Sequence, residues 1–237
     1  MLRLEQLFQR LEVLVNRESA LDHHFALATL FEILDVSSRA DLKSDLLKEL
    51  ERHRSQLQGF RGHPGISEAA LDEVVGRVER VYAALNSMQG KAGQSLSSHD
   101  WLMSIRSRIG IPGGTCGFDL PSYHAWQHRS AAARIADLQT WVATVMPLAQ
   151  ALFVLLGLLR DSGSPQRVAA PGGQFQQRLQ EGKTYHLLRL RLDESQGLVP
   201  EISGHRLLVS VRLMRPDEDG RLRAWAEDAA FEIALCA

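Results

Sequence analysis

The sequence predicts an α+β protein in which an all-helical N-terminal domain precedes a smaller, sandwich-like antiparallel β domain. Over the first two-thirds of the chain, apolar residues recur at three- and four-residue spacing, which is typical of amphipathic helices. Toward the C-terminus, apolar and polar residues alternate, which is typical of half-buried strands. Glycines and prolines in residues 163–184 indicate a linker or long loop between these patterns. We therefore expect a helical domain at 1–162 and a β domain at 163–237.

Eight segments carry the helical period, each with one apolar side. They lie around residues 4–15, 20–34, 38–57, 68–85, 101–109, 121–128, 131–144 and 147–159. In the second segment, the predicted buried set begins with Leu21 and Phe25. Ser67 is expected to cap the fourth helix, and Ser38 followed by Asp41 suggests a cap for the third.

The most apolar stretch of the chain, residues 142–159, is predicted to be a buried core helix. Pro147 and Gly157 interrupt it, and Arg160 and Asp161 close it. A bilayer-spanning helix needs about 20 predominantly apolar residues. The N-terminus enters a charged amphipathic pattern without the apolar region of a signal peptide. We therefore expect a cytoplasmic protein with no direct membrane insertion.

Composition narrows the classes of function. The chain has 237 residues, with 27 basic and 28 acidic side chains, which disfavours a polycation that binds nucleic acid through net charge. Two distant cysteines, Cys116 and Cys236, do not form a disulfide framework and favour a reducing compartment. Because the chain has no Cys-x-x-Cys, a zinc ribbon is excluded.

Three C-terminal segments alternate as strands do, around residues 185–193, 206–215 and 231–236. In the first, Arg189 and Arg191 fall on the side opposite to Leu188, Leu190 and Leu192. In the second, Arg206 and Arg212 do the same, whereas Leu207 begins the apolar side. If the two strands pair or are neighbours, four guanidinium groups share one surface suited to an acidic or mixed-charge peptide. The alternative is an ordinary solvated sheet face.

Catalytic and metal-binding signals are weak. His124 and His128 have the i,i+4 spacing of metal ligands, but no glutamate base lies between them, and a third ligand would have to come from Asp119 or further away. The alternative is a surface helix with a partly buried His124. The turn at Pro112–Gly114 lacks the lysine of a P-loop, and the chain has no nucleophile elbow. The sequence therefore predicts a protein that is not an enzyme and has no metal or cofactor.

Four segments, in order along the chain, resemble the ZapD family. They are Leu-Arg-Leu-Glu-Gln-Leu-Phe at 2–8, Glu-Ile-Leu-Asp-Val at 32–36 followed by Arg39 and Leu-Leu-Lys-Glu-Leu-Glu-Arg at 46–52, the stretch 106–124 leading to Trp126, and Pro-Glu-Ile-Ser-Gly-His-Arg at 200–206 continuing to Val-Arg-Leu-Met at 211–214. The third is the most specific, reading Arg-x-Arg-x-x-Ile-Pro-Gly-Gly-x-Cys-x-Phe-Asp-Leu-Pro-x-x-His.

The resemblance implies a non-enzymatic cell-division factor. Such a protein is a homodimer that binds the short C-terminal tail of the tubulin-like GTPase FtsZ. It holds two FtsZ filaments together at midcell, with the Z-ring. Many weak contacts along the filament pair then act together by avidity. Bundling of this kind needs no nucleotide or metal from the protein itself. The dimer interface is expected in the helical domain.

The resemblance also implies a positively charged recognition pocket between the domains. The residues carried over by position, with their basic neighbours and the predicted strand face, are Arg3, Arg39, His124, Arg206, Arg212, Arg106, Arg108, Arg189 and Arg191. Trp101 and Leu208 stand where relatives can carry arginine. The family usually has further residues before the Leu-Arg-Leu-Glu motif, and these are expected to contribute to the early fold.

Two other hypotheses remain open from the residues alone. A generic peptide- or nucleic-acid-binding module would use the same basic face, and it predicts retention on heparin with a steep salt dependence. A metal-dependent enzyme around His124 and His128 would need a positioned carboxylate for acid–base chemistry, and the sequence does not identify one.

Overall fold

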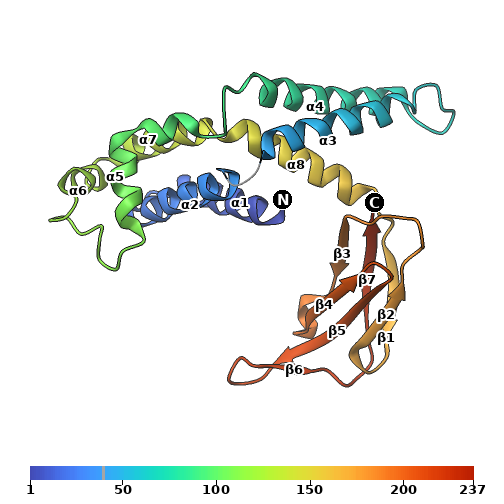
Figure 1. The fold of residues 1–237 in the computed structure, drawn as a ribbon. Coiled ribbons are helices and arrows are strands. Elements are labelled where there is room, and N and C mark those ends of the chain that lie inside the picture. The colour runs from blue at the N-terminus through green and yellow to red at the C-terminus, as the bar shows by residue number, and fades with distance from the viewer. Residues whose placement is uncertain (39–40) are drawn as a thin grey trace. The chain divides into compact units, whose positions relative to one another are not determined.

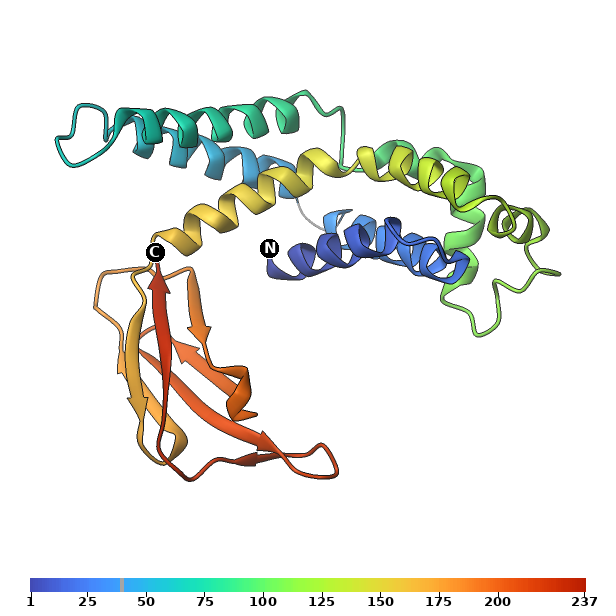
Figure 2. The same cartoon turned by 180° about the vertical axis from the view of Figure 1, so that it is seen from behind.

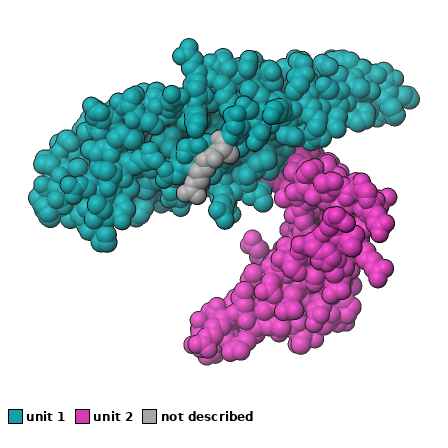
Figure 3. Space-filling view, viewed as in Figure 1, with its two compact units in different colours: residues 1–156 teal, residues 157–237 magenta. Residues whose placement is uncertain are grey.

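The computed structural model describes residues 1–38 and 41–237, and it confirms the α+β class (Figure 1). Helices occupy the N-terminal part, and antiparallel strands occupy the C-terminal part. The chain divides into two compact units, residues 1–156 and 157–237, which are coloured separately in Figure 3. Each unit has a core of its own, and each is described by itself below.

The helical unit is built from antiparallel helix pairs. Its helices are α1 (Leu2–Val15), α2 (Ala20–Ser38), α3 (Leu42–Gln58), α4 (Glu68–Ser87), α5 (Asp100–Ile109), α6 (Pro121–Gln127), α7 (Ala131–Ala143) and α8 (Met146–Asp161), with a 3-10 turn, η1, at Gln94–Ser98. Two pairs, α1 with α2 and α3 with α4, lie side by side in both views (Figures 1 and 2). The predicted period is confirmed in α1, where Leu4, Phe8, Leu11 and Val15 are all buried.

Two details of the helix prediction were wrong. The side chains of Leu21 and Phe25, expected in the core, are 63% and 50% exposed, while Leu27 and Leu30 of the same helix are fully buried. Neighbouring helices therefore cover the later part of α2 and leave one side of its first turns in water. Ser38 does not cap α3, since it ends α2 and its hydroxyl donates to the Asp35 carbonyl at 3.0 Å.

The cap predicted for the fourth helix is confirmed. Ser67 is extended, and its hydroxyl oxygen accepts a hydrogen bond from the backbone N–H of Ala70 at 3.4 Å. The hydroxyl satisfies one of the free N–H groups that open α4.

Within the described part of the chain, no single helix is long and apolar enough to cross a membrane. Helices α7 and α8 together have the length and composition, but they meet at a bend of 66°. Six residues of α8, between Leu148 and Leu156, are buried in the fold. This burial confirms a core helix in the apolar stretch, but the helix begins at Met146, and residues 142–143 belong to α7.

The β unit consists of two antiparallel sheets. Its strands are β1 (Gln166–Ala170), β2 (Gln174–Arg178), β3 (Leu187–Arg191), β4 (Val199–His205), β5 (Leu208–Pro216), β6 (Leu222–Ala224) and β7 (Ala229–Cys236). One sheet has the order β1-β7-β3, and the other has the order β2-β5-β4, with β6 paired to β5. Strands that follow one another along the chain often lie in different sheets, so most pairings are non-local.

The two sheets share one apolar core. Val209, Val211 and Leu213 of β5 pack with Phe231 and Ile233 of β7. The alternation of apolar residues in β5 and β7 therefore places their apolar sides against each other, as in a sandwich.

Strands β1 and β2 lie inside residues 163–184, where the sequence indicates a linker or long loop. Gly172 and Gly173 of this segment form the turn that carries the chain from one sheet to the other. Gly173 has a φ of +72°, and a Cβ atom there would lie 2.2 Å from the Trp225 carbonyl oxygen. Only glycine fits at this position. The glycines that suggested a flexible linker are therefore needed for a tightly packed turn between two strands.

Candidate functional site

The arginines predicted to share a strand face do not share one. Leu188 and Leu190 of β3 pack on the sandwich core, so Arg189 and Arg191 project from the outer side of the β1-β7-β3 sheet. Arg212 belongs to β5, whose buried residues face the same core from the other sheet. The two sets therefore lie on opposite outer faces of the sandwich, and the prediction of one common surface was wrong.

The two arginines of β3 already have partners. The guanidinium of Arg189 donates to the Arg160 carbonyl at 2.8 Å and is partly buried. Arg191 forms an exposed ion pair with Glu232 of β7 at 3.2 Å. Of the two, only Arg191 is open to a partner, because an exposed ion pair exchanges readily with solvent.

Arg212 and Arg206 are the more available cations of the β unit. Arg212 lies on the outer face of β5, 3.6 Å from the Glu201 carboxylate, and their side chains are 57% and 59% exposed. Arg206 and Leu207 are not strand residues, because they form the exposed turn between β4 and β5.

The candidate residues of the helical unit are spread over several helices. Arg106 of α5 is half-buried and forms an ion pair with Asp35 of α2. Arg108 near the end of α5 and Arg3 on α1 are exposed. Among the described residues, no hydrogen bond or ion pair joins Arg3, Arg108 and His124 to one another. Arg39 lies outside the described residues.

A tight turn places α6 after α5. Gly113 has a φ of +70°, and a Cβ atom at Gly114 would lie 2.6 Å from the Arg108 carbonyl oxygen, so the chain folds directly onto the end of α5. His124 then sits on α6 against Gly117, where a Cβ atom would lie 2.9 Å from the imidazole Nδ1. Gly113 and Gly114 of the family motif therefore bring the chain back against the end of α5, and Gly117 leaves room for the His124 ring.

His124 and His128 are neighbours on the surface. Their ring centroids are 4.2 Å apart, and Nδ1 of His128 lies 2.8 Å from the His124 carbonyl oxygen. His124 is exposed rather than partly buried. Within residues 1–38 and 41–237, no three histidine, cysteine, aspartate or glutamate side chains are grouped to hold a metal ion.

The aromatic residues Trp101, Tyr123, Trp126 and Trp141 of this region form a cluster. The rings of Tyr123 and Trp126 are stacked at 5.9 Å, and Trp101 packs 5.5 Å from Trp141. Burial raises the pKa of the Tyr123 hydroxyl far above its usual value, so that the group stays protonated. Trp101 therefore has a packing role.

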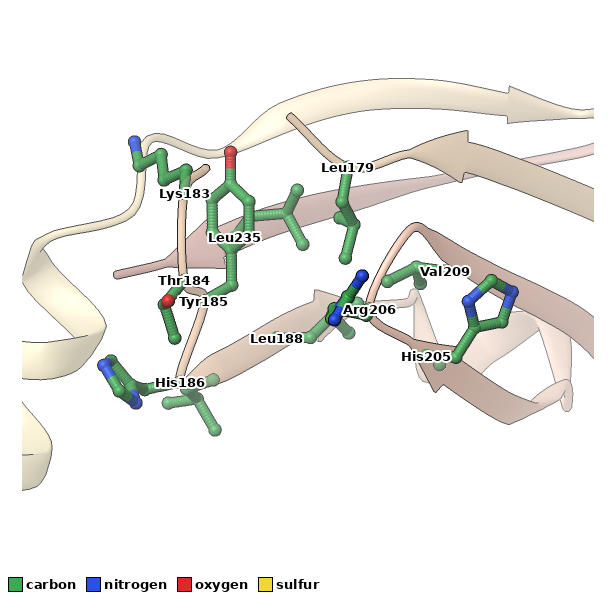
Figure 4. A pocket seen from close by; sticks show the side chains of 12 residues that line it. Leu179, Lys183, Thr184, Tyr185, His186, Leu188, His205, Arg206, Val209 and Leu235 are labelled. Carbon is green, nitrogen blue, oxygen red and sulfur yellow. The ribbon is translucent and has the colours of Figure 1, made fainter. Parts of the chain in front are cut away.

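A pocket at one end of the sandwich was not predicted. It has a volume of about 360 Å³ and lies where the segment before β3 approaches the turn after β4 (Figure 4). Lys183, Tyr185 and His186 line it from the first segment. His205 at the end of β4 and Arg206 in the turn line the other side. Of these, only Arg206 was a candidate, because Lys183 lies in the predicted linker and Tyr185 and His186 begin a predicted strand.

Comparisons with known proteins agree with the motifs. The family model described as "ZapD: Cell division protein" matches residues 2–212. The "Cell division protein ZapD" of Janthinobacterium sp. (strain Marseille) is 46% identical over 236 residues, which cover 100% of this chain and 94% of that protein. The chain therefore belongs to the ZapD family, whose members are non-enzymatic cell division proteins.

Proposed function

We propose that this protein binds the C-terminal tail of FtsZ and cross-links FtsZ filaments as a homodimer, in the cytoplasm at midcell with the Z-ring. The observation that carries the proposal is the family match over residues 2–212, which contains all nine candidate cationic positions. The protein contributes neither nucleotide nor metal to this bundling.

The exposed cations support a peptide partner with carboxylates. Arg3, Arg108 and Arg206 are exposed, and Arg212 has only a long, solvent-exposed contact to Glu201. A planar guanidinium group binds a carboxylate through two parallel hydrogen bonds. Arg106 and Arg189 contribute less, because Asp35 and the Arg160 carbonyl already hold them.

An apolar groove on the helical unit supports self-association. It has a volume of about 490 Å³ and is lined by residues of α1, α7 and α8, among them Phe8, Met146 and Phe153. Met146 and Phe153 are each 37% exposed, so the groove presents large apolar side chains to solvent. We assign this groove to a second copy of the chain, because filament cross-linking needs two tail-binding sites in one particle.

Co-sedimentation with GTP-assembled FtsZ tests the proposal. Full-length FtsZ is compared with FtsZ that lacks its C-terminal tail, each with and without this protein. We expect bundles to pellet with the full-length filaments and not with the truncated ones. Bundling of both filaments would refute the tail as the binding site, and bundling of neither would refute the proposed function.

A further inference from the structure

The pocket at the end of the sandwich has an apolar floor supplied by both sheets. Leu188 and Leu235 come from the β1-β7-β3 sheet, and Leu179 and Val209 come from the other sheet and the residue that follows β2. The backbone N–H of Leu179 donates to the Leu207 carbonyl at 2.8 Å, which fixes this side of the pocket. The floor is therefore built from residues held by the fold, and the pocket, at about 360 Å³, is large enough to admit a large apolar side chain.

The rim of the pocket is cationic. Lys183 and Arg206 stand on its two sides, and no aspartate or glutamate is among its lining residues (Figure 4). The Lys183 ammonium lies 5.2 Å from the centroid of the Tyr185 ring. Within the described parts of the chain, neither Lys183 nor Arg206 has a carboxylate within ion-pair distance. Two uncompensated cations around an apolar cavity favour a ligand that is apolar in the middle and anionic beside it.

The strands beside the pocket have free edges. Strand β3 is an edge strand of one sheet, and β4 is an edge strand of the other. Both strands contribute residues to the pocket lining. Ile202 of β4 lies opposite the buried Val211, yet 45% of it is exposed, so the core is uncovered along this edge. An extended peptide can pair with such an edge and place alternate side chains in a pocket.

We propose that this pocket receives an apolar side chain from an extended acidic peptide, whose carboxylates are held by Lys183 and Arg206. The inference rests on the proposed function, since the peptide is then the FtsZ tail. It adds Lys183 and the cavity in the β unit to the cationic positions that the family resemblance implies.

Gly204 offers a way to close the pocket without removing a charge. It lines the cavity opposite Val209, and a Cβ atom there would meet the nearest Val209 methyl at 3.8 Å, an ordinary contact. Its φ is not positive, so other residues fit the backbone. Gly204→Val therefore narrows the cavity while favouring the strand, and Gly204→Ala narrows it less. Ala169→Val is the matched control, because Ala169 is an exposed strand residue of the other sheet.

The test measures binding of a synthetic FtsZ tail peptide to the full-length protein by fluorescence anisotropy. We expect Gly204→Val to weaken binding at least about tenfold, Gly204→Ala to weaken it less, and Ala169→Val to bind as the wild type does. We also expect Lys183→Gln to weaken binding and to flatten its salt dependence, whereas Lys48→Gln on α3 changes neither.

The possible failures are distinguishable. If Gly204→Val binds the peptide as tightly as the wild type, the pocket assignment is overturned, while binding of the tail stands. If the wild type does not bind the peptide, the proposed function fails, and this inference fails with it. Circular dichroism melts of each variant separate loss of binding from loss of folding.

Discussion

Arg134 is a buried cation held by neutral groups. Its guanidinium donates to Nδ1 of His23 at 2.9 Å, to the Glu18 carbonyl at 2.6 Å and to the Gln127 carbonyl at 3.1 Å. Because Nδ1 of His23 accepts a hydrogen bond, its ring is neutral, and Nε2 donates to the Arg17 carbonyl at 2.6 Å. These contacts join the start of α2 to α7. Burying the charge of Arg134 costs desolvation free energy, and the hydrogen bonds to its guanidinium group offset that cost.

This arrangement predicts that acid destabilises the helical unit. Burial lowers the pKa of His23, the backbone bond to Arg17 opposes this shift, and the charge of Arg134 adds to it. The unfolded state, with the ordinary pKa of 6.5, then binds more protons than the folded state. The stabilising contribution is complete above that pH and is lost as the pH falls through the lowered pKa of the folded state. We expect a smaller free energy of unfolding at pH 5.5 than at pH 7.5, measured by urea denaturation.

The contribution of His23 can be separated from that of other histidines. Burial also lowers the pKa values of His24 and His53, so the wild-type dependence has several sources. His23→Gln is expected to flatten the dependence on pH, and the exposed His63→Gln is expected to leave it unchanged. Identical slopes for the wild type and His23→Gln would show that the buried pair does not sense pH.

Arg212 is predicted to act in binding and not in folding. Its ion pair with Glu201 is exposed, so Arg212→Ala should change the free energy of unfolding by no more than about 0.5 kcal/mol. The same variant should weaken the bundling of FtsZ. Glu201→Gln should strengthen bundling, because Glu201 competes with the tail for the guanidinium group. Pelleting assays and urea denaturation measure the two effects.

Two comparisons complete this prediction. Arg223→Ala removes another exposed cation of the same sheet, which is paired with Asp217 at 3.0 Å, and should leave bundling unchanged. His124→Ala removes an exposed imidazole of α6 and should weaken bundling without unfolding the helical unit. Wild-type bundling by both Arg212→Ala and His124→Ala would sink the assignment of these positions to the tail site.

At the scale of elements, the helices were predictable because their signal is local. A period of 3.6 residues and a cap such as Ser67 depend on residues within one or two turns. Strands β1 and β2 have no such signal: β1 reads Gln-Arg-Val-Ala-Ala, and β2 reads Gln-Phe-Gln-Gln-Arg, with Phe175 as its one large apolar residue. Both are edge strands that bury little, so the alternation that reveals a central strand is weak.

The candidate site was only partly predictable for a related reason. The side of a strand on which Arg189 or Arg212 projects follows from alternation, and the structure confirms it. The sheet to which each strand belongs depends on pairing between distant segments, such as β3 with β7. Lys183 was missed because it lies in the irregular segment before β3, which leaves no periodic pattern in the sequence.

At the scale of the whole molecule, binding a tail and bundling filaments are separable properties. One chain with one tail site can coat a filament, but it cannot join two filaments. A dimer presents two sites, and repeated weak contacts along a filament pair then add up. The apolar groove between α1, α7 and α8 is the surface that we assign to the second copy.

Met146→Glu tests this separation. Met146 lines the groove and opens α8, where a carboxylate is compatible with the partial positive charge of a helix N-terminus. We expect this variant to change from dimer to monomer in analytical ultracentrifugation, to bind the tail peptide with unchanged affinity per chain, and to lose bundling. Ala69→Glu, which adds the same charge to the exposed first turn of α4, should remain a bundling dimer. A dimeric Met146→Glu that still bundles would place the contact between copies on another surface, and a monomeric one that bundles would show that a single chain bridges two filaments.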